Sequence, residues 1–214
     1  MKKTVAVVLC GMLLLSMLAG CVEKDPLVGT WEGELDFSPM VNATMVSTGT
    51  NMEKYFTFTD LTVKVTMTFQ EDKHCTLSID RDGFDAMLEK LKSQVSTGIV
   101  GVLEDLLEGN GAEMTVQEYL DLSGMDLDML IDSTLNVVIT EQTLKELELE
   151  GLYQTEEGKL FISDDPDSGF DADRASVYVL AGDTLTIQAP QETEDGEILQ
   201  HIFPLVLQRM AEEE

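Results

Sequence analysis

The chain has 214 residues, of which 41 are acidic and 13 are basic, so its formal net charge is −28. So large an acidic excess excludes nucleic-acid binding, because contacts to phosphate groups need clustered lysine and arginine side chains. It also argues against docking on anionic lipid head groups. The length suits one domain with a sizeable hydrophobic core, or one domain with a substantial insertion.

The first 20 residues have the features of an export signal. Lys2 and Lys3 precede a mostly apolar run over residues 5–18, and small residues follow it at positions 19 and 20. This order is typical of a secretory signal peptide, and the apolar run is too short for a membrane-spanning helix. We therefore predict that residues 1–20 are removed after export.

The sequence Leu-Ala-Gly-Cys at positions 18–21 resembles the lipobox of bacterial lipoproteins, in which the cysteine is acylated and becomes the new N-terminus. The alternative is an ordinary signal peptide followed by a coincidental cysteine. The resemblance implies a lipidation site at Cys21, a lipid-anchored tether over residues 21–28, and an exported protein anchored to the bacterial cell membrane or envelope. A stable anchor at Cys21 needs more than one acyl chain.

Strand patterns follow directly after this tether. Apolar and polar residues alternate over residues 30–37, which predicts a half-buried strand. Residues 38–52, rich in Ser, Thr, Gly and Asn, are predicted to form a loop. The clearest pattern is a double run over residues 61–79 with a polar turn at 70–74, which predicts an antiparallel hairpin with one buried face. Cys75 lies within this alternation, so we interpret it as a packed thiol.

Between residue 84 and about residue 140 the apolar residues recur every three or four positions, which predicts an amphipathic helical block. Gly98 and Gly101 are expected to weaken the first helix. Thr115 and Glu118 have the spacing of a capping box, which predicts the start of a second helix, and a third helix follows. The block is interpreted either as a lid over the sheet or as a layer packed against it.

Strand patterns return over residues 151–163 and 176–188, each divided by a glycine-containing turn, and end with residues 202–210. This order predicts a mainly β fold with a helical insertion near 84–140. We expect an antiparallel meander that forms either a barrel or a strongly bent sheet, within a single domain over residues 29–214.

Gly29-Thr30-Trp31, the two later hairpins and the final sequence Leu-Val-Leu-Gln-Arg together resemble the lipocalin or calycin superfamily, and most closely the lipocalin-like domains of bacterial lipoproteins. The resemblance implies that Trp31 plugs the closed end of a barrel and that Arg209 packs across it. A guanidinium over a partly screened indole gains about 0.5–2 kcal/mol. Ordinary lipocalins lack a helical block of this size, so the chain departs from the family there.

A hollow barrel would take its lining from one face of the long hairpin. The six residues on that face are Val63, Val65, Met67, Phe69, Leu77 and Ile79. The lining is also expected to include aromatic residues from later strands: Tyr153, Phe161 and Tyr178. Such a lining suits a small hydrophobic ligand, whereas the alternative is a barrel filled by its own side chains.

The sequence contains no pattern typical of a catalytic or cofactor site. It has no Gly-x-Ser-x-Gly, His-Glu-x-x-His or phosphate-binding motif, and His74 and His201 lack metal-ligand spacing. A weak calcium candidate is formed by alternate aspartates in an acidic segment: Asp165, Asp167, Asp171 and Asp173. Because their register differs from that of an EF-hand loop, we prefer to interpret the segment as a solvated loop.

The sequence therefore predicts a non-enzymatic lipoprotein of the cell envelope, without a cofactor, that binds a small, mostly apolar ligand in a lipocalin-like barrel. The alternative is a structural or protein-interaction module with a filled core, whose acidic face or helical block contacts a partner that the sequence does not identify.

Overall fold

The computed structural model of the chain describes residues 25–47, 52–138, 147–165, 167, 169–190 and 200–211. The predictions for residues 1–24, which include the signal peptide and lipidation at Cys21, lie outside the described residues and stay predictions.

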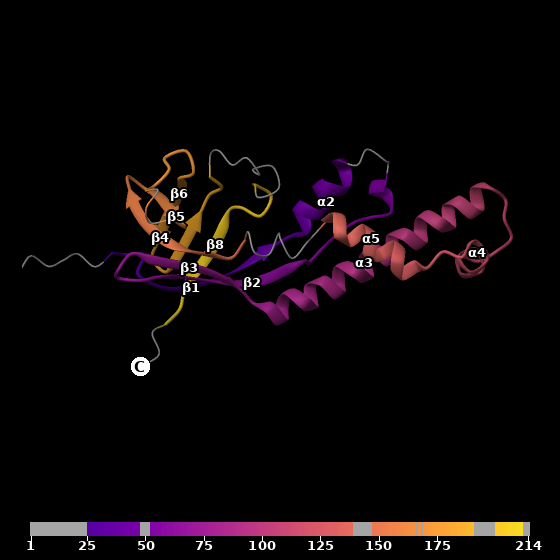
Figure 1. Ribbon diagram of the computed structural model, residues 1–214, viewed down its shortest axis with the longest axis horizontal. Helices are drawn as coiled ribbons and strands as arrows, with labels where there is room; N and C mark the ends of the chain where they lie inside the picture. The colour runs from indigo at the N-terminus through magenta and orange to yellow at the C-terminus, as the bar shows by residue number, and fades with distance from the viewer. Residues whose placement is uncertain are drawn as a thin grey trace, which may run out of the picture.

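Eight antiparallel strands form a closed barrel in which each strand pairs with the next along the chain and the last pairs with the first (Figure 1). The strands are β1 (Gly29–Asp36), β2 (Thr62–Phe69), β3 (His74–Ile79), β4 (Leu149–Glu156), β5 (Lys159–Ser163), β6 (Ser176–Ala181), β7 (Thr184–Ile187) and β8 (Leu205–Arg209). The predicted mainly β meander is confirmed, and of its two forms the barrel is the one observed.

The register of β1 and β2 explains why their sequences alternate. Trp31 lies opposite Met67 and Leu35 lies opposite Val63, and all four side chains are buried. The intervening positions, such as Lys64, are exposed. One face of each strand therefore forms the interior of the barrel, which is the arrangement that a period of two predicts.

The barrel closes where β1 pairs with β8 through Trp31–Arg209, Glu32–Gln208 and Gly33–Leu207. A Cβ atom on Gly33 would lie 2.5 Å from the carbonyl oxygen of Val206 and 2.7 Å from a methyl carbon of Leu207. Only a glycine permits so close an approach at this point. Closure leaves the sheet without free edges.

The helical insertion consists of α3 (Arg81–Gly109), α4 (Val116–Ser123) and α5 (Leu127–Val138). We call residues 81–138 the helical arm. The 29 residues of α3 give it a length of about 44 Å. The helical arm extends away from the barrel along the long axis of the molecule, and α5 returns beside α3 (Figure 1). The predicted helical block is confirmed.

Contacts at both ends hold the helical arm in shape. Near the barrel, the ring of Phe84 meets that of Phe37 edge-on, with 6.4 Å between centroids. At the far end, the Thr115 hydroxyl accepts a hydrogen bond of 3.2 Å from the Glu118 N–H, and the Glu118 carboxylate accepts one of 2.8 Å from the Thr115 N–H. This is the predicted capping box.

The loop predicted over residues 38–52 is wrong over its first part, where the chain forms α2 (Ser38–Ser47), followed by a short 3-10 helix, η1 (Met52–Lys54). The Asn42 amide donates to the carbonyl of Phe58 at 2.8 Å and accepts from its N–H at 3.0 Å. Met40 and Val41 are buried. Tertiary contacts therefore stabilise a helix whose Ser, Asn, Thr and Val residues have low intrinsic helix propensity.

The glycines expected to weaken the first helix do not interrupt it, because α3 runs without a break. A Cβ atom on Gly98 would overlap the ring of Phe56. The absence of a side chain at Gly98 thus provides the surface on which Phe56 packs, and this contact replaces what the helix loses in intrinsic propensity.

Candidate functional site

The first part of the site is the closed end of the barrel, where Trp31 is completely buried. The guanidinium carbon of Arg209 lies 4.1 Å from the centre of the Trp31 ring. Arg209 also donates through Nη1 to the carbonyl of Val28 at 2.7 Å and through Nη2 to the carbonyl of Pro26. The structure therefore brings Trp31 and Arg209 together, and Arg209 holds the segment before β1 across the base.

Trp31 and Gly29 complete this arrangement from the strand side. The Trp31 indole N–H donates to the carbonyl of Leu27 at 2.8 Å, which satisfies its polar group in a buried position. Gly29 has φ +135°, and a Cβ atom there would lie 2.8 Å from Nη1 of Arg209. The Gly-x-Trp sequence thus has a physical explanation: the glycine makes room for the arginine that covers the tryptophan.

Three further residues, Asp25, Lys73 and Tyr153, meet at the same end, and we call them the basal cluster. The Tyr153 hydroxyl donates to the Asp25 carboxylate at 3.0 Å, and Lys73 forms a salt bridge with the same carboxylate oxygen. Lys73 also lies 5.0 Å from the centre of the Tyr153 ring. The basal cluster ties the chain that precedes β1 to the β2–β3 turn and to β4.

The pKa values of the basal cluster follow from these contacts. Burial alone would raise the pKa of Asp25, but the hydrogen bond from Lys73, together with the other hydrogen bonds to the carboxylate, holds that pKa below its usual value. Burial, and then the neighbouring Asp25 carboxylate, raise the pKa of the Tyr153 hydroxyl above its usual value. At neutral pH the pair therefore consists of an ionised carboxylate and a protonated phenol.

The second part of the site is a cavity of about 210 Å³ in the other half of the barrel. Every strand contributes at least one side chain to its lining, which includes Leu35, Met67, Leu77, Leu149, Leu160, Ser176, Ile187 and Leu205. The cavity is therefore the lumen of the barrel above the Trp31 plug. None of the residues that line it belongs to the helical arm, so the structure does not support the interpretation of the helical block as a lid.

Of the six residues predicted to line a cavity, Met67 and Leu77 do so. The other four, Val63, Val65, Phe69 and Ile79, are buried in the core but lie outside the lining. Phe69 is at the closed end, where its ring meets that of Tyr153 edge-on at 4.8 Å. Sequence reasoning identified the interior face correctly but not the level along the barrel at which the interior is hollow.

Tyr153, Phe161 and Tyr178, which the sequence suggested as further lining, are absent from the cavity wall. Instead Leu160 and Ile162 of β5 line it, because they point inward from that short strand while Phe161 between them does not. Their alternation was the signal that could have identified them, but nothing local indicates which strands surround the hollow part.

One charged side chain, Arg174, stands at the cavity wall, which also includes the polar residue Ser176. Arg174 is exposed to solvent, so the cavity reaches the surface beside it. Within the described part of the chain, no hydrogen bond or ion pair involves Arg174. The cavity therefore combines an apolar interior with a single cationic group at its rim.

The structure does not bring the four aspartates of the calcium candidate together. Asp165 accepts a hydrogen bond of 2.9 Å from the N–H of Asp167, and Asp171 accepts one of 2.9 Å from the N–H of Asp173. Over the residues that the structure describes, no group of three acidic, histidine or cysteine side chains is placed to hold a metal ion.

Cys75 is buried in the core, as the strand alternation predicted. Burial raises the pKa of its thiol to about 11. A thiol with this pKa is protonated at neutral pH and is a poor nucleophile or metal ligand, so Cys75 acts as a small apolar core residue.

Within the described ranges, no helix combines the length and the apolar character needed to cross a membrane. No protein-family model, curated protein or solved structure matches the chain significantly.

Proposed function

We propose that this protein is an exported, lipid-anchored binding protein of the cell envelope whose barrel holds a small, mostly apolar molecule. The observation that carries the proposal is the division of the barrel into a plugged half, closed by Trp31 and Arg209, and a hollow half lined by all eight strands. Apolar cavities with a few polar groups at the rim are the usual form of small-molecule sites.

The size of the cavity limits what it binds. Sites for drug-sized ligands usually measure about 300–1,000 Å³, whereas this cavity measures about 210 Å³. It therefore suits a compact apolar molecule, or one end of a longer apolar chain whose remainder leaves beside Arg174.

The proposed anchor would orient the barrel on the membrane. Cys21 lies four residues before Asp25, which the basal cluster holds at the closed end. Four residues span at most about 14 Å. With acyl chains on Cys21, the closed end would face the membrane, and the ligand would enter from the side of the barrel away from Asp25.

A variant that fills the cavity tests the binding proposal. Ile162 lines the cavity, so Ile162→Trp should reduce the affinity for the neutral apolar dye N-phenyl-1-naphthylamine by about tenfold or more, the effect of losing about 1.4 kcal/mol. The matched control is Val179→Trp, because Val179 is 56% exposed on the outside of β6. Dye fluorescence titration measures both affinities, and circular dichroism checks that both variants are folded.

Equal dye affinity in the two variants would contradict the proposal. The proposal would also be contradicted if residues 22–214, purified without delipidation, were empty in native mass spectrometry and did not bind the dye. Either result would favour the alternative of an interaction module whose core holds no ligand.

A further inference from the structure

The far end of the helical arm exposes large hydrophobic side chains that the fold does not use. Half of the ten most exposed large hydrophobic residues among those described lie within residues 106–129. They are Leu106, Met114, Leu122, Met125 and Met129, and we call this set the arm tip. Leu122 is 78% exposed and Met129 is 72% exposed, so neither contributes to the packing of the helices.

The helices at this end are already held together by other residues. Leu107 of α3, Leu120 of α4 and Ile131 of α5 are buried. The capping box at Thr115 fixes the start of α4, and Gly124 ends it in a left-handed conformation with φ 68°. The arm tip thus consists of apolar side chains that are presented outward by helices whose inner faces are buried.

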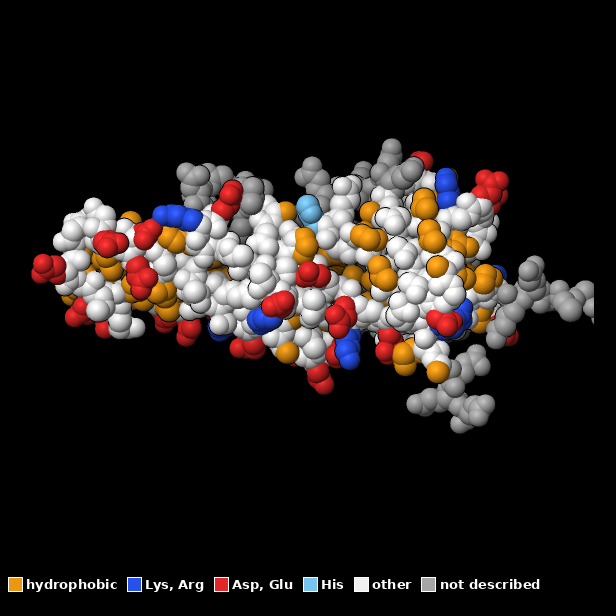
Figure 2. Space-filling view, turned by 180° about the vertical axis from the view of Figure 1, so that it is seen from behind, with side chains coloured by type: hydrophobic (Ala, Val, Ile, Leu, Met, Phe, Trp, Pro, Cys, Tyr) orange, Lys and Arg blue, Asp and Glu red, His pale blue; other side chains and the backbone are white. Residues whose placement is uncertain are grey.

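The charge of the segment that carries the arm tip is of one sign, although Lys54 reaches it from outside and forms a salt bridge with Asp105, next to Leu106. Residues 93–138 contain nine acidic residues and no basic residue. The basic residues of the helical arm, Arg81, Lys90 and Lys92, lie nearer the barrel and form salt bridges with Glu148, Asp60 and Asp132. Figure 2 shows acidic side chains beside hydrophobic ones at the end of the arm.

The acidic charge favours some kinds of binding partner for this exposed apolar surface over others. A second copy of the chain would bring an equally acidic arm tip against the first, and like charges repel across an interface. An anionic lipid surface is disfavoured for the same reason. A cationic partner would gain both from burial of its apolar side chains and from the acidic border.

We infer that the arm tip is a docking surface for a basic amphipathic helix of a partner protein. Methionine side chains are unbranched and adapt to different partner side chains, and an amphipathic helix laid on an apolar surface is a recurrent mode of recognition. The arm tip carries three methionines beside two leucines, so it suits a helix with large apolar residues on one face and lysine or arginine on the other.

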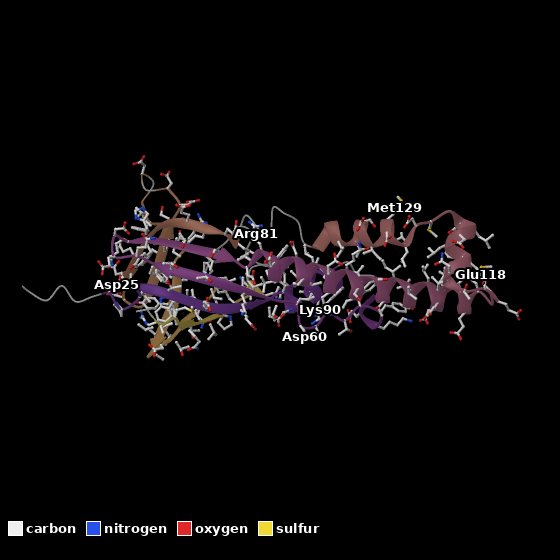
Figure 3. The ribbon with its side chains drawn as sticks, turned by 90° about the horizontal axis from the view of Figure 1, so that it is seen from below. Asp25, Asp60, Arg81, Lys90, Glu118 and Met129 are labelled. Carbon is white, nitrogen blue, oxygen red and sulfur yellow. The ribbon has the colours of Figure 1, made fainter. Side chains whose placement is uncertain are left out.

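The position of the arm tip fits this role. Figure 3 shows Glu118 near the end of the molecule opposite Asp25, and Met129 on the same arm but nearer the barrel. The helical arm therefore holds the docking surface away from the closed end of the barrel, and a helix bound there would leave the cavity uncovered. The inference does not depend on the ligand proposed for the barrel.

The test uses two fluorescent peptides of leucine and lysine with the same composition, one arranged as an amphipathic helix and the other scrambled. Fluorescence anisotropy measures their binding to the chain from residue 22 onward, which retains every described residue. The amphipathic peptide should bind about tenfold more tightly than the scrambled peptide, because only the helix presents its leucines to the arm tip.

Variants locate the surface. Leu122→Ser combined with Met129→Ser should weaken binding of the amphipathic peptide by about tenfold or more. The matched control is Val179→Ser combined with Val206→Ser, which removes exposed apolar side chains from the barrel and should leave binding unchanged. Because all four residues are exposed, thermal melting followed by circular dichroism should show no loss of folding.

Three results would overturn the inference. Equal affinity for the two peptides would show that net charge alone attracts them. If the double variant Leu122→Ser, Met129→Ser and the parent bound the amphipathic peptide equally well, the binding surface would lie elsewhere. Self-association of the parent in sedimentation experiments, if the double variant abolished it, would show that the arm tip binds a second copy of the chain.

Discussion

The side chain of Arg209 shows how much of the closed end depends on one residue. It covers the ring of Trp31, donates to two carbonyls of the preceding segment and lies on the strand that closes the barrel. Gly29 is required beside it, because a side chain there would meet its guanidinium. The sequence resemblance suggested the pair, but the two carbonyl contacts were visible only in the fold.

Arg209→Ala should lower the free energy of unfolding by about 2–3 kcal/mol. It removes a cation–π contact worth about 0.5–2 kcal/mol and leaves two carbonyls without their donor. The chain contains a single tryptophan, so urea unfolding followed by its fluorescence reports on this end directly. Arg209→Lys should retain only part of the stability, because lysine lacks the planar fork. An unchanged urea midpoint in Arg209→Ala would show that the contacts have no net value.

The basal cluster predicts a dependence of stability on pH. Since the pKa of Asp25 is lowered in the folded protein, its contribution is fully present above the unfolded pKa of about 3.9 and is lost as the pH falls through the folded pKa. Asp25→Asn should therefore lower the melting temperature at pH 7 but have a smaller effect near pH 2.5. A difference between variant and parent that stays constant over this range would contradict the assignment.

At the scale of the element, α2 and α3 show where local propensity is overridden. Residues 38–47 form a helix because Asn42 bonds the backbone of Phe58, a contact between residues far apart in sequence. The helix α3 continues through Gly98 because Phe56 packs there. Both contacts lie outside the windows that periodicity covers, so sequence reasoning predicted a loop in the first case and a weakened helix in the second.

Gly98→Ala should destabilise the protein by about 1–3 kcal/mol, although alanine is the better helix former, because its methyl group overlaps the Phe56 ring. Gly101→Ala is the matched control. Its Cβ atom would lie 3.4 Å from the nearest atom of Tyr55, an ordinary contact, so it should be neutral or stabilising by up to about 1 kcal/mol. Thermal or urea unfolding compares the two. Equal effects would mean that the ring of Phe56 moves aside freely.

At the scale of the whole molecule, the two ends of the structure have different chemistry. The closed end of the barrel holds the chain that leads back to the proposed anchor, and the helical arm extends the other way to an acidic, methionine-containing tip (Figure 3). The cavity lies in the barrel between them. An anchored protein of this shape would present its docking surface at a distance from the membrane.

Cys21→Ala should yield an exported protein that no longer incorporates radioactive palmitate, because the proposed acylation needs the Cys21 thiol. Cys75→Ala, which changes a buried cysteine, is the control and should be labelled normally. Continued labelling of Cys21→Ala would contradict the lipobox interpretation.

The sequence by itself determined the local features of this protein: the alternating strands, the two later hairpins, the helical block with its capping box, and the interior face of the long hairpin. Each of these is a repeating pattern that neighbouring residues encode. Only the tertiary structure decided that the sheet closes, that Met67 and Leu77 line a cavity while Phe69 does not, and that Asp25, Lys73 and Tyr153 meet. The spacing of apolar residues along the sequence indicates which side of a helix or strand is apolar. Closure of the barrel and the position of its cavity depend instead on the register of all eight strands and on which apolar faces cover one another.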